Sequence, residues 1–398
     1  MNGDKAFDSR RIVMITLVDF CNLDCVYCYE KNKKKNKMNF ATAKKIIDEE
    51  MNKDEKAEMI EFDLFGGEPF LNFELIQDIC KYLEENTWKK KWLLFATTNG
   101  TLLNDETKKW LRSKKGRVFL GLSLDGTPQM HNMNRSNSYS LIDTDFFLEM
   151  YPEQYAKMTI SKNTIANLAE GIIYLHNLGF RVSANLAEGI EWDKKEYKNI
   201  LIEQLLKLAD FYLDNPKIEP CNLIDKPLQF NTFNKEGINK YCGTGTGMCS
   251  YDVSGRKYPC QFFMPLSVGE EKAENSKNIK FEENITRDKL DLKCQKCSIK
   301  NICATCLGAN YMLSDNIYHK SDMYCYLMKT EYIVSCYFKY NQYLRKQIKL
   351  SQIEEIRLLA TLLNFQKEYI TEFEENDEVT EYLISRINNI EFSNNIKF

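Results

Sequence analysis

Three cysteines near the N-terminus have the types and spacing that metal chemistry requires. Cys21, Cys25 and Cys28 stand in the run D-F-C-N-L-D-C-V-Y-C-Y-E, directly after the apolar stretch 12–18. Three thiolates can hold three corners of a 4Fe-4S cube and leave the fourth iron open to a small molecule. The alternative is a zinc site or buried thiols, but structural zinc sites need four ligands and no fourth cysteine lies near this triplet.

Eight further cysteines form a second group between residues 242 and 325. Their spacing is C-x6-C-x5-G-x4-C followed by C-x2-C-x5-C-x2-C-x18-C, for Cys242, Cys249, Gly255, Cys260, Cys294, Cys297, Cys303, Cys306 and Cys325. By spacing alone, the second series could also be a zinc knuckle. Cys80, Cys221 and Cys336 remain, and we interpret them as small buried side chains.

Short turns with glycine and polar residues follow three of the predicted strands. F-G-G-E-P-F at 65–70 contains two glycines, which let the backbone approach a ligand closely. T-T-N-G at 97–100 and L-S-L-D-G at 122–126 end the next two strands. Asn99 and Asp125 could equally be turn formers, because Asn-Gly and Asp-Gly are turn signals by themselves.

These turns belong to a region, from residue 11 to about 211, in which strand and helix patterns alternate six times. Strands are predicted to begin near Ile12, Ile60, Leu93, Val118, Lys157 and Phe180, and helices to span 41–51, 74–85, 105–112 and 164–177, with Gly179 after the last of these. Such alternation predicts an α/β fold with a parallel sheet. In an incomplete barrel or an open sheet alike, ligands bind at the C-terminal ends of the strands.

Composition excludes several classes of protein. The 398 residues are 43% hydrophobic with a formal net charge of −3, which predicts a globular protein with no general attraction to nucleic acid. No run resembles a signal peptide or a membrane helix, so we expect a cytoplasmic protein. In a reducing compartment, fourteen cysteines favour metal ligation over disulfides.

Two other segments have open interpretations. The irregular run between 135 and 156 is longer than a usual loop, and it could wall a substrate site or be a solvated insertion. The lysine-rich run 31–37 is typical of a solvated face, with a landing patch for an acidic peptide as the alternative.

The triplet, with Asn22, Leu23 and Tyr27, resembles the signature of the radical S-adenosylmethionine (SAM) superfamily. The resemblance implies a partial (β/α)6 TIM-like barrel and SAM chelating the open iron. It also implies that Gly66, Gly67 and Glu68 engage the amino group of SAM, that Ser123 binds its ribose or carboxylate, and that Tyr27 and Asn99 complete the contacts. His131 and Arg135 resemble an H-x-x-x-R element of the same families, although a loop histidine with ordinary hydrogen bonds is the favoured interpretation.

The second cysteine group resembles the SPASM domain, which carries two auxiliary 4Fe-4S clusters. Three clusters are then expected in all. The first auxiliary set would be Cys242, Cys249, Cys260 and Cys306, and the second would be Cys294, Cys297, Cys303 and Cys325. The two-residue gap between Cys303 and Cys306 departs from the three residues of many relatives. The expected domains are the barrel (8–215), a bridge (216–241), the SPASM domain (242–345) and a helical tail (346–398).

The resemblance implies reductive cleavage of SAM to a 5′-deoxyadenosyl radical that takes hydrogen from a substrate. Anaerobic sulfatase maturases carry Y-P-C-D where this chain has Y-P-C-Q, and Gln261 has no carboxylate to act as the base. The favoured function is therefore maturation of a ribosomally made precursor peptide by a thioether or carbon–carbon cross-link. A formylglycine-forming sulfatase-type maturase or another radical SAM oxidoreductase is the first alternative, and a non-catalytic zinc-binding interaction protein is the second.

The expected partners follow from that function. They are the precursor peptide and an electron donor of the flavodoxin or ferredoxin type, with no nucleic acid and no membrane. Since the first predicted strand begins near residue 12, no small leader-binding domain is expected before the barrel. A separate protein, the 135–156 segment or the C-terminal tail would then bind the leader.

Overall fold

A parallel sheet forms the centre of the computed structural model, which describes residues 10–53, 56–192, 196–226, 238–240, 242–285, 289–297, 299, 303, 305–356 and 358. The first four strands pair in chain order: β1 (Arg10–Val18), β2 (Met59–Gly66), β3 (Lys91–Thr98) and β4 (Val118–Leu122). Along β2 the buried residues alternate as Ile60, Phe62 and Leu64, the period expected of a strand with one face against helices.

Two more parallel strands continue this arrangement. β5 (Tyr155–Ile160) pairs with β6 (Arg181–Leu186), and a single bridge joins Ser123, just after β4, to Lys157 on β5. The Leu124 amide donates to the Lys157 carbonyl at 3.0 Å. Six parallel strands therefore follow one another in chain order, which confirms the expected partial barrel.

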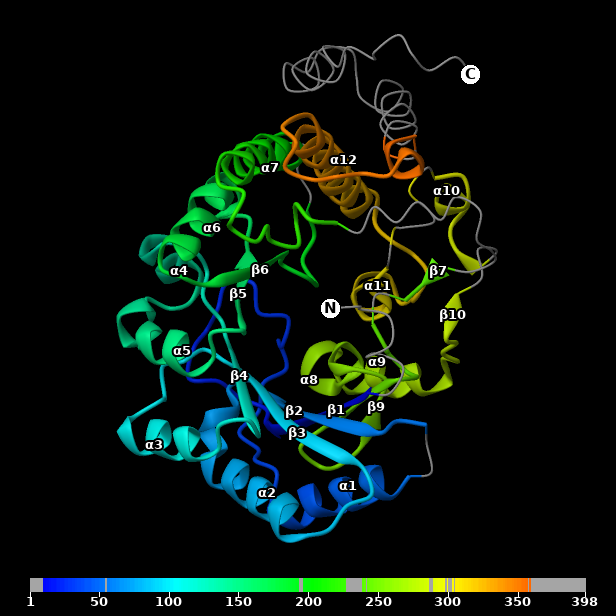
Figure 1. The fold of residues 1–398 in the computed structure, drawn as a ribbon. Helices are drawn as coiled ribbons and strands as arrows, with labels where there is room; N and C mark the ends of the chain where they lie inside the picture. The colour runs from blue at the N-terminus through cyan, green and yellow to red at the C-terminus, as the bar shows by residue number, and fades with distance from the viewer. Residues whose placement is uncertain are drawn as a thin grey trace.

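The helices form an outer arc around these strands (Figure 1). They are α1 (Phe40–Asn52), α2 (Phe73–Glu85), α3 (Asp105–Ser113), α4 (Pro128–Asn134), α5 (Thr144–Met150), α6 (Leu168–Asn177) and α7 (Glu196–Asp214), with short 3-10 turns η1 (Pro69–Asn72), η2 (Tyr139–Leu141) and η3 (Ile165–Asn167). In α1 the Asn39 side chain caps the first turn by accepting from the Thr42 amide. Gly179 has φ +100° and ends α6 as predicted.

The segment between 135 and 156 is more regular than its sequence indicated. It contains η2 and α5, and α5 buries Phe146, Phe147 and Met150. Asp143 and Glu149 pair with Lys108 and Arg112 of α3 at 2.7 and 3.1 Å. In the described structure this segment thus packs against the helical layer of the barrel.

The C-terminal region joins the barrel through its sheet. β8 (Met248–Tyr251) pairs in parallel with β1 and antiparallel with β9 (Lys257–Tyr258), so the complete sheet has the order β4-β3-β2-β1-β8-β9. A separate antiparallel pair is made by β7 (Ile238–Asn239) and β10 (Asn284–Ile285). The cysteine-rich region is therefore built onto the first barrel strand.

Helices make up most of the remaining described residues, and all of them except the last are short. They are η4 (Gln261–Phe263), α8 (Pro265–Val268), α9 (Glu270–Asn275), η5 (Ser276–Asn278), α10 (Leu292–Gln295), α11 (Leu307–Ser314) and the long α12 (Asp322–Leu344). α12 lies beside α7 (Figure 1), where the Tyr337 hydroxyl donates to Asp210 at 3.2 Å and Arg345 pairs with Asp214 at 2.7 Å. Most of the predicted helical tail, residues 359–398, lies outside the described residues. Among the helices that the structure describes, none has the length and apolarity to span a bilayer.

Candidate iron-sulfur and SAM site

The cysteine triplet lies in the loop that follows β1. The Leu23 amide donates to the Cys21 thiol sulfur at 3.3 Å, and the Cys28 amide donates to the Cys25 carbonyl at 3.0 Å. Burial raises the pKa of Cys21 to about 11 and also raises the pKa of Cys25 and Cys28, and the charges of neighbouring thiols in the triplet add to the shift at Cys21 and Cys25. The three thiols are thus close neighbours, and a bound metal would displace their protons.

The two glycines of the G-G-E-P turn hold this loop against the end of β2. A Cβ at Gly66 would lie 2.2 Å from the Val18 carbonyl oxygen, and one at Gly67 would lie 2.1 Å from that of Phe20. The Gly67 and Glu68 amides donate to these same two carbonyls at 3.3 and 3.1 Å. Glycine is therefore required here for close contact between two backbones, whatever ligand the turn contacts.

The Glu68 carboxylate is occupied by hydrogen bonds within the protein. It accepts from the Thr98 hydroxyl at 2.7 Å, from the Asn99 amide at 2.8 Å and from the Phe70 amide at 3.2 Å, and it is 1% exposed. Burial raises its pKa to about 7 although these donors oppose the shift. Glu68 thus fastens the end of β2 to the end of β3.

Asn99 and Ser123 stand at the ends of the next two strands. The Asn99 side chain donates to Asn22 Oδ1 at 2.9 Å and lies 3.9 Å from the Cys21 sulfur. Ser123 is 8% exposed, and its amide donates to the Thr98 carbonyl at 2.9 Å. The triplet, Glu68, Asn99 and Ser123 therefore share one edge of the sheet, as parallel strands require.

Tyr27 is held by a buried ion pair. Its hydroxyl donates to Asp125 Oδ2 at 2.7 Å, and the Arg135 guanidinium lies 5.4 Å from the centre of its ring. Asp125, which is fully buried, also accepts from Arg135 Nε at 2.9 Å and from the Asn134 side chain at 3.1 Å. Arg135 lowers the pKa of Cys25 against the larger effect of burial. The Asp125–Arg135 pair therefore supports the triplet loop through its hydrogen bond to Tyr27.

His131 lies beside this Asp125–Arg135 pair. It lies on α4 instead of a loop, is fully buried, and its Nδ1 accepts from the Asp125 amide at 3.3 Å. Its Nε2 is 3.1 Å from the Ser138 hydroxyl, which itself donates to the Arg135 carbonyl at 2.6 Å, so Nε2 carries the proton. Burial lowers the pKa of His131 to about 4, and this neutral side chain makes ordinary hydrogen bonds.

The structure brings three of the four cysteines of the first auxiliary set together. Burial raises the pKa of Cys306 well above its usual value, with added contributions from Cys260 and Cys242. Cys242 likewise raises the pKa of Cys260. Cys249 is not in this group: its sulfur lies 3.3 Å from Arg11 Nη2 and 3.7 Å from Glu50 Oε1, beside β1 and α1.

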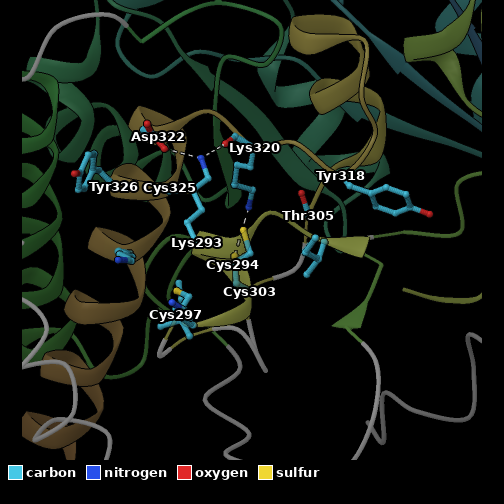
Figure 2. Close-up of a pocket in the computed structure, with 14 residues that line it drawn as sticks. Lys293, Cys294, Cys297, Cys303, Thr305, Tyr318, Lys320, Asp322, Cys325 and Tyr326 are labelled. Carbon is cyan, nitrogen blue, oxygen red and sulfur yellow. Dashed lines mark hydrogen bonds and ion pairs between the residues drawn. The ribbon is translucent and has the colours of Figure 1, made fainter. Parts of the chain in front are cut away.

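The second auxiliary set surrounds one cavity (Figure 2). Its volume is about 460 Å³, and Cys294, Cys297, Cys303 and Cys325 all line it. Lys320 is 4% exposed, and its Nζ lies 3.4 Å from the Cys303 sulfur. A hydrogen bond from Cys325 lowers the pKa of Cys294 to about 6.

The second auxiliary set has the donor type and the space that an iron-sulfur cluster needs. Within the described residues, no three His, Cys, Asp or Glu side chains converge closely enough to hold a single metal ion. The four thiols border a cavity instead, and thiolates are the ligands that iron-sulfur clusters use. The residues thus fit an iron-sulfur cluster at this cavity.

The triplet loop and the first auxiliary group are in direct contact. Tyr29, next to Cys28, packs on Phe262 with ring centres 4.6 Å apart. Gly189, in the loop after β6, lies against both Tyr29 and Met312 of α11. The neighbouring Glu188 accepts from the Tyr324 hydroxyl at 2.6 Å, and its charge raises the pKa of Cys306. One side of the barrel mouth therefore faces the auxiliary cysteines.

Two features of this site escaped the sequence interpretation. Asp125 was weighed only as a turn residue and Arg135 only as part of a motif, yet they form the buried pair beneath Tyr27. The H-x-x-x-R motif marked Arg135, but it carried no signal of the partner Asp125, which lies ten residues earlier in the chain. Glu188 had no motif around it, since only the fold brings the loop after β6 to Cys306.

Comparison with known proteins agrees with this geometry. Residues 10–141 match the family model described as a 4Fe-4S single cluster domain. A Methanocaldococcus jannaschii protein, MJ0907, is 28% identical over 60% of this chain and 80% of its own length. The cysteine-type anaerobic sulfatase-maturating enzyme of Clostridium perfringens is 26% identical, covering 71% of this chain and 84% of that enzyme. The AdoMet-dependent heme synthase of Methanosarcina barkeri is 23% identical, covering 80% of this chain and 97% of that enzyme.

Solved structures share the fold. Native anSMEcpe with bound AdoMet superposes with a TM-score of 0.64 at 20% identity, over 85% of this chain and all of that one. Streptococcus suis SuiB bound to precursor peptide SuiA superposes with a TM-score of 0.51 at 17% identity, over 80% of this chain and 76% of that one. Together with the cysteine loop at the end of β1, these similarities identify the chain as a radical SAM family enzyme with a SPASM-like 4Fe-4S region.

Proposed function

We propose that this enzyme uses SAM to oxidise a peptide and thereby forms a thioether or carbon–carbon cross-link. Cys21, Cys25 and Cys28 would hold the SAM-binding cluster, and Cys294, Cys297, Cys303 and Cys325 an auxiliary one. A third cluster would belong to the group that includes Cys242, Cys260 and Cys306. When bound, the clusters would supply the electron that cleaves SAM and accept the electron that leaves the substrate.

The residues at the sheet edge would position SAM. Gly66 and Gly67 bring the backbone of their turn against the triplet loop, while Asn99, Ser123 and Tyr27 stand at the neighbouring strand ends or on the loop itself. Glu68, whose oxygens accept three internal hydrogen bonds, would hold this edge in shape. The barrel's task is to place one substrate C–H bond beside the deoxyadenosyl radical and to exclude water.

The observation that carries a peptide substrate is the contact between the triplet loop and the auxiliary region through Tyr29 and Phe262. Substrate at the barrel mouth would touch both cysteine regions. Two structures with this fold contain bound peptides, a Cp18Cys peptide with anSMEcpe and the precursor SuiA with SuiB. These relatives support a peptide as the substrate class.

Gln261 favours a cross-link over formylglycine. It lies directly before Phe262, and its buried Oε1 has no hydrogen-bond partner within the described residues. An amide oxygen there can accept a hydrogen bond from substrate, but it cannot take a proton from a thiol at neutral pH. A cross-link removes two hydrogens from the peptide: one leaves as a hydrogen atom to deoxyadenosyl, the other as a proton, and one electron passes on.

Formylglycine formation from a cysteine remains the second candidate because the sulfatase-maturating relative covers 71% of the chain. Glu188 would be the carboxylate available to it, beside Cys306. Its pKa is raised by burial, which suits a proton acceptor near neutral pH.

The two candidates separate by product mass. The anaerobically reconstituted, reduced enzyme with SAM would be incubated with precursor peptides encoded near its gene and with a cysteine-containing sulfatase peptide. A loss of two hydrogens on a precursor peptide supports the cross-link, whereas conversion of cysteine to an aldehyde contradicts it. Cys25→Ala should abolish deoxyadenosine formation while auxiliary iron is retained, and retained SAM cleavage would refute the triplet assignment.

The remaining partners are part of the same proposal. A flavodoxin- or ferredoxin-type protein would deliver the electron, and a separate protein could bind the leader of the precursor. We place the enzyme in the cytoplasm, where reduced thiols and such donors occur together. The domain boundaries 8–215, 216–241, 242–345 and 346–398 complete the proposal.

A further inference from the structure

Cys249 points away from the other thiols of its set because of strand parity. β8 pairs Cys249 with Val13 and the preceding Met248 with Ile12. Cys249 and Val13 join the core shared with α1, whereas Met248 and Met14 join the core that contains Cys260. Neighbouring residues of a strand face opposite sides of a sheet, so a ligand on the side of Cys260 would have to occupy an adjacent position.

The Cys249 thiol has a well-built environment of its own. It is 3% exposed and lies against Glu50, a fully buried carboxylate of α1. Glu50 accepts from Arg11 Nε at 2.8 Å, from Lys257 Nζ at 2.7 Å and from the Tyr251 hydroxyl at 2.6 Å. These contacts join β1, α1, β8 and β9. Turning Cys249 toward the other thiols would break the β1–β8 register and this network.

The other three thiols come from three separate segments. Cys242 lies before β8, Cys260 follows β9 and Cys306 caps α11. Cys242 Sγ is 2.9 Å from the Thr244 hydroxyl. The same hydroxyl also hydrogen-bonds to Cys260, so Cys242 and Cys260 meet at Thr244.

We propose that Cys249 is a structural thiol and that the first auxiliary cluster is held by Cys242, Cys260 and Cys306 alone. One of its irons then lacks a cysteine ligand and is open to an anionic donor from outside the protein, such as a thiolate. This rests on the proposed function only in requiring that these three thiols bind a cluster. It departs from the four-cysteine set that the SPASM resemblance implies.

The first test counts iron in a chain whose radical cluster has been removed by Cys21→Ala, Cys25→Ala and Cys28→Ala. Into this background we would add Cys249→Ala, Cys242→Ala or Cys306→Ala, reconstitute anaerobically, and measure iron and sulfide per chain. Cys249→Ala should keep the background content. Cys242→Ala and Cys306→Ala should lose about four irons each. Equal loss in all three variants would overturn the proposal.

The second test needs no change at Cys249 and so does not depend on that variant folding. The reduced triplet-free chain would be treated with ¹³C-labelled cyanide, and its paramagnetic signals examined for ¹³C hyperfine coupling. Coupling is expected at one cluster, because cyanide binds an iron that lacks a protein ligand. Absence of coupling would mean a closed cluster and would refute the open iron.

These outcomes are separate from the fate of the proposed function. Deoxyadenosine formation and peptide product are measured on the unmodified enzyme, where the triplet is intact. The iron counts and cyanide coupling are measured where the triplet is absent and no catalysis occurs. An active peptide-modifying enzyme with a closed first auxiliary cluster would refute this inference alone.

Discussion

The N-terminal cysteine triplet and the four cysteines around the C-terminal cavity are positioned in different ways. The triplet loop is fastened by backbone contacts to the end of β2 and by a buried ion pair beneath Tyr27. In the second set, Cys325 belongs to the long α12, but Cys294 belongs to the four-residue α10, and Cys297 and Cys303 stand outside regular elements. The barrel thus builds the first site before metal binds, whereas metal binding itself would complete the second.

The strongest test of this difference is Gly67→Ala. The new Cβ would lie 2.1 Å from the Phe20 carbonyl oxygen and 2.7 Å from the Cys21 nitrogen, and both are backbone atoms that cannot move aside. We expect loss of the triplet's iron and at least a ~100-fold loss of deoxyadenosine formation, which the positioning requirement explains. Iron content and SAM cleavage would be measured on the same preparation.

Gly247→Ala is the matched control, since a Cβ there would be 3.9 Å from Gly243 and meet ordinary contact. The auxiliary iron of Gly67→Ala should also be retained. If the Gly67 variant kept its full iron content and activity, the triplet loop would not depend on the barrel backbone.

The second test removes the charge beneath the triplet. Arg135→Met leaves Asp125 buried without its cation, and breaking such a pair costs roughly 3–5 kcal/mol of unfolding free energy. Urea unfolding of the anaerobic protein would measure the loss. In the double variant Asp125→Asn/Arg135→Met, part of the loss should be recovered because no unpaired charge remains. A loss below about 1 kcal/mol in the single variant would contradict the pair's role.

Sequence patterns predicted the elements of the barrel better than the side chains between them. The strand at Ile12 and the helix ending before Gly179 follow from apolar period and glycine placement, which are local. The side of β8 on which Cys249 lies depends on its pairing with β1, more than two hundred residues away in the chain. Cysteine spacing carries no information on that parity, and so the predicted four-cysteine set could not reveal it.

The same limit applies to charged groups. Glu50 belongs to a helix whose apolar face was predictable, but its contacts with Lys257 and Tyr251 come from the C-terminal hairpin. A buried carboxylate and a solvated one look alike in sequence. Motifs predicted where the barrel strands end, whereas tertiary contacts determine which polar side chains lie at those ends.

The third test is the pH dependence of stability that the buried His131 of the barrel should produce. The folded pKa of His131 is about 4, below its usual 6.5, so the unfolded chain binds the extra proton between these values. Stability is then complete above pH 6.5 and lost as the pH falls toward 4. Between pH 7 and pH 5 we expect about 2 kcal/mol of this loss. His131→Gln should lack that component in urea unfolding at the two pH values, and an unchanged slope would contradict it.

The smallest effect is expected in the second auxiliary set, at Lys320. Burial alone would lower the pKa of this lysine, but Cys303, Cys325 and Cys294 raise it, so its ammonium faces the thiolates. Lys320→Met removes a positive charge beside the cluster and should make its reduction harder. We expect the lost interaction between this charge and the reduced cluster to be ~1–2 kcal/mol, which corresponds to a midpoint potential roughly 40–90 mV more negative.

Lys293→Met is the matched control on the same cavity, because Asp322 neutralises that lysine at 2.6 Å (Figure 2). Its shift should be smaller. The measurement is a redox titration monitored by electron paramagnetic resonance in the triplet-free chain, so that the radical cluster adds no signal. Equal shifts for the two lysines would mean that only the overall charge of the region matters. A larger shift for Lys320 alone would show that this site, which the barrel does not build, still contains one side chain positioned to tune its metal.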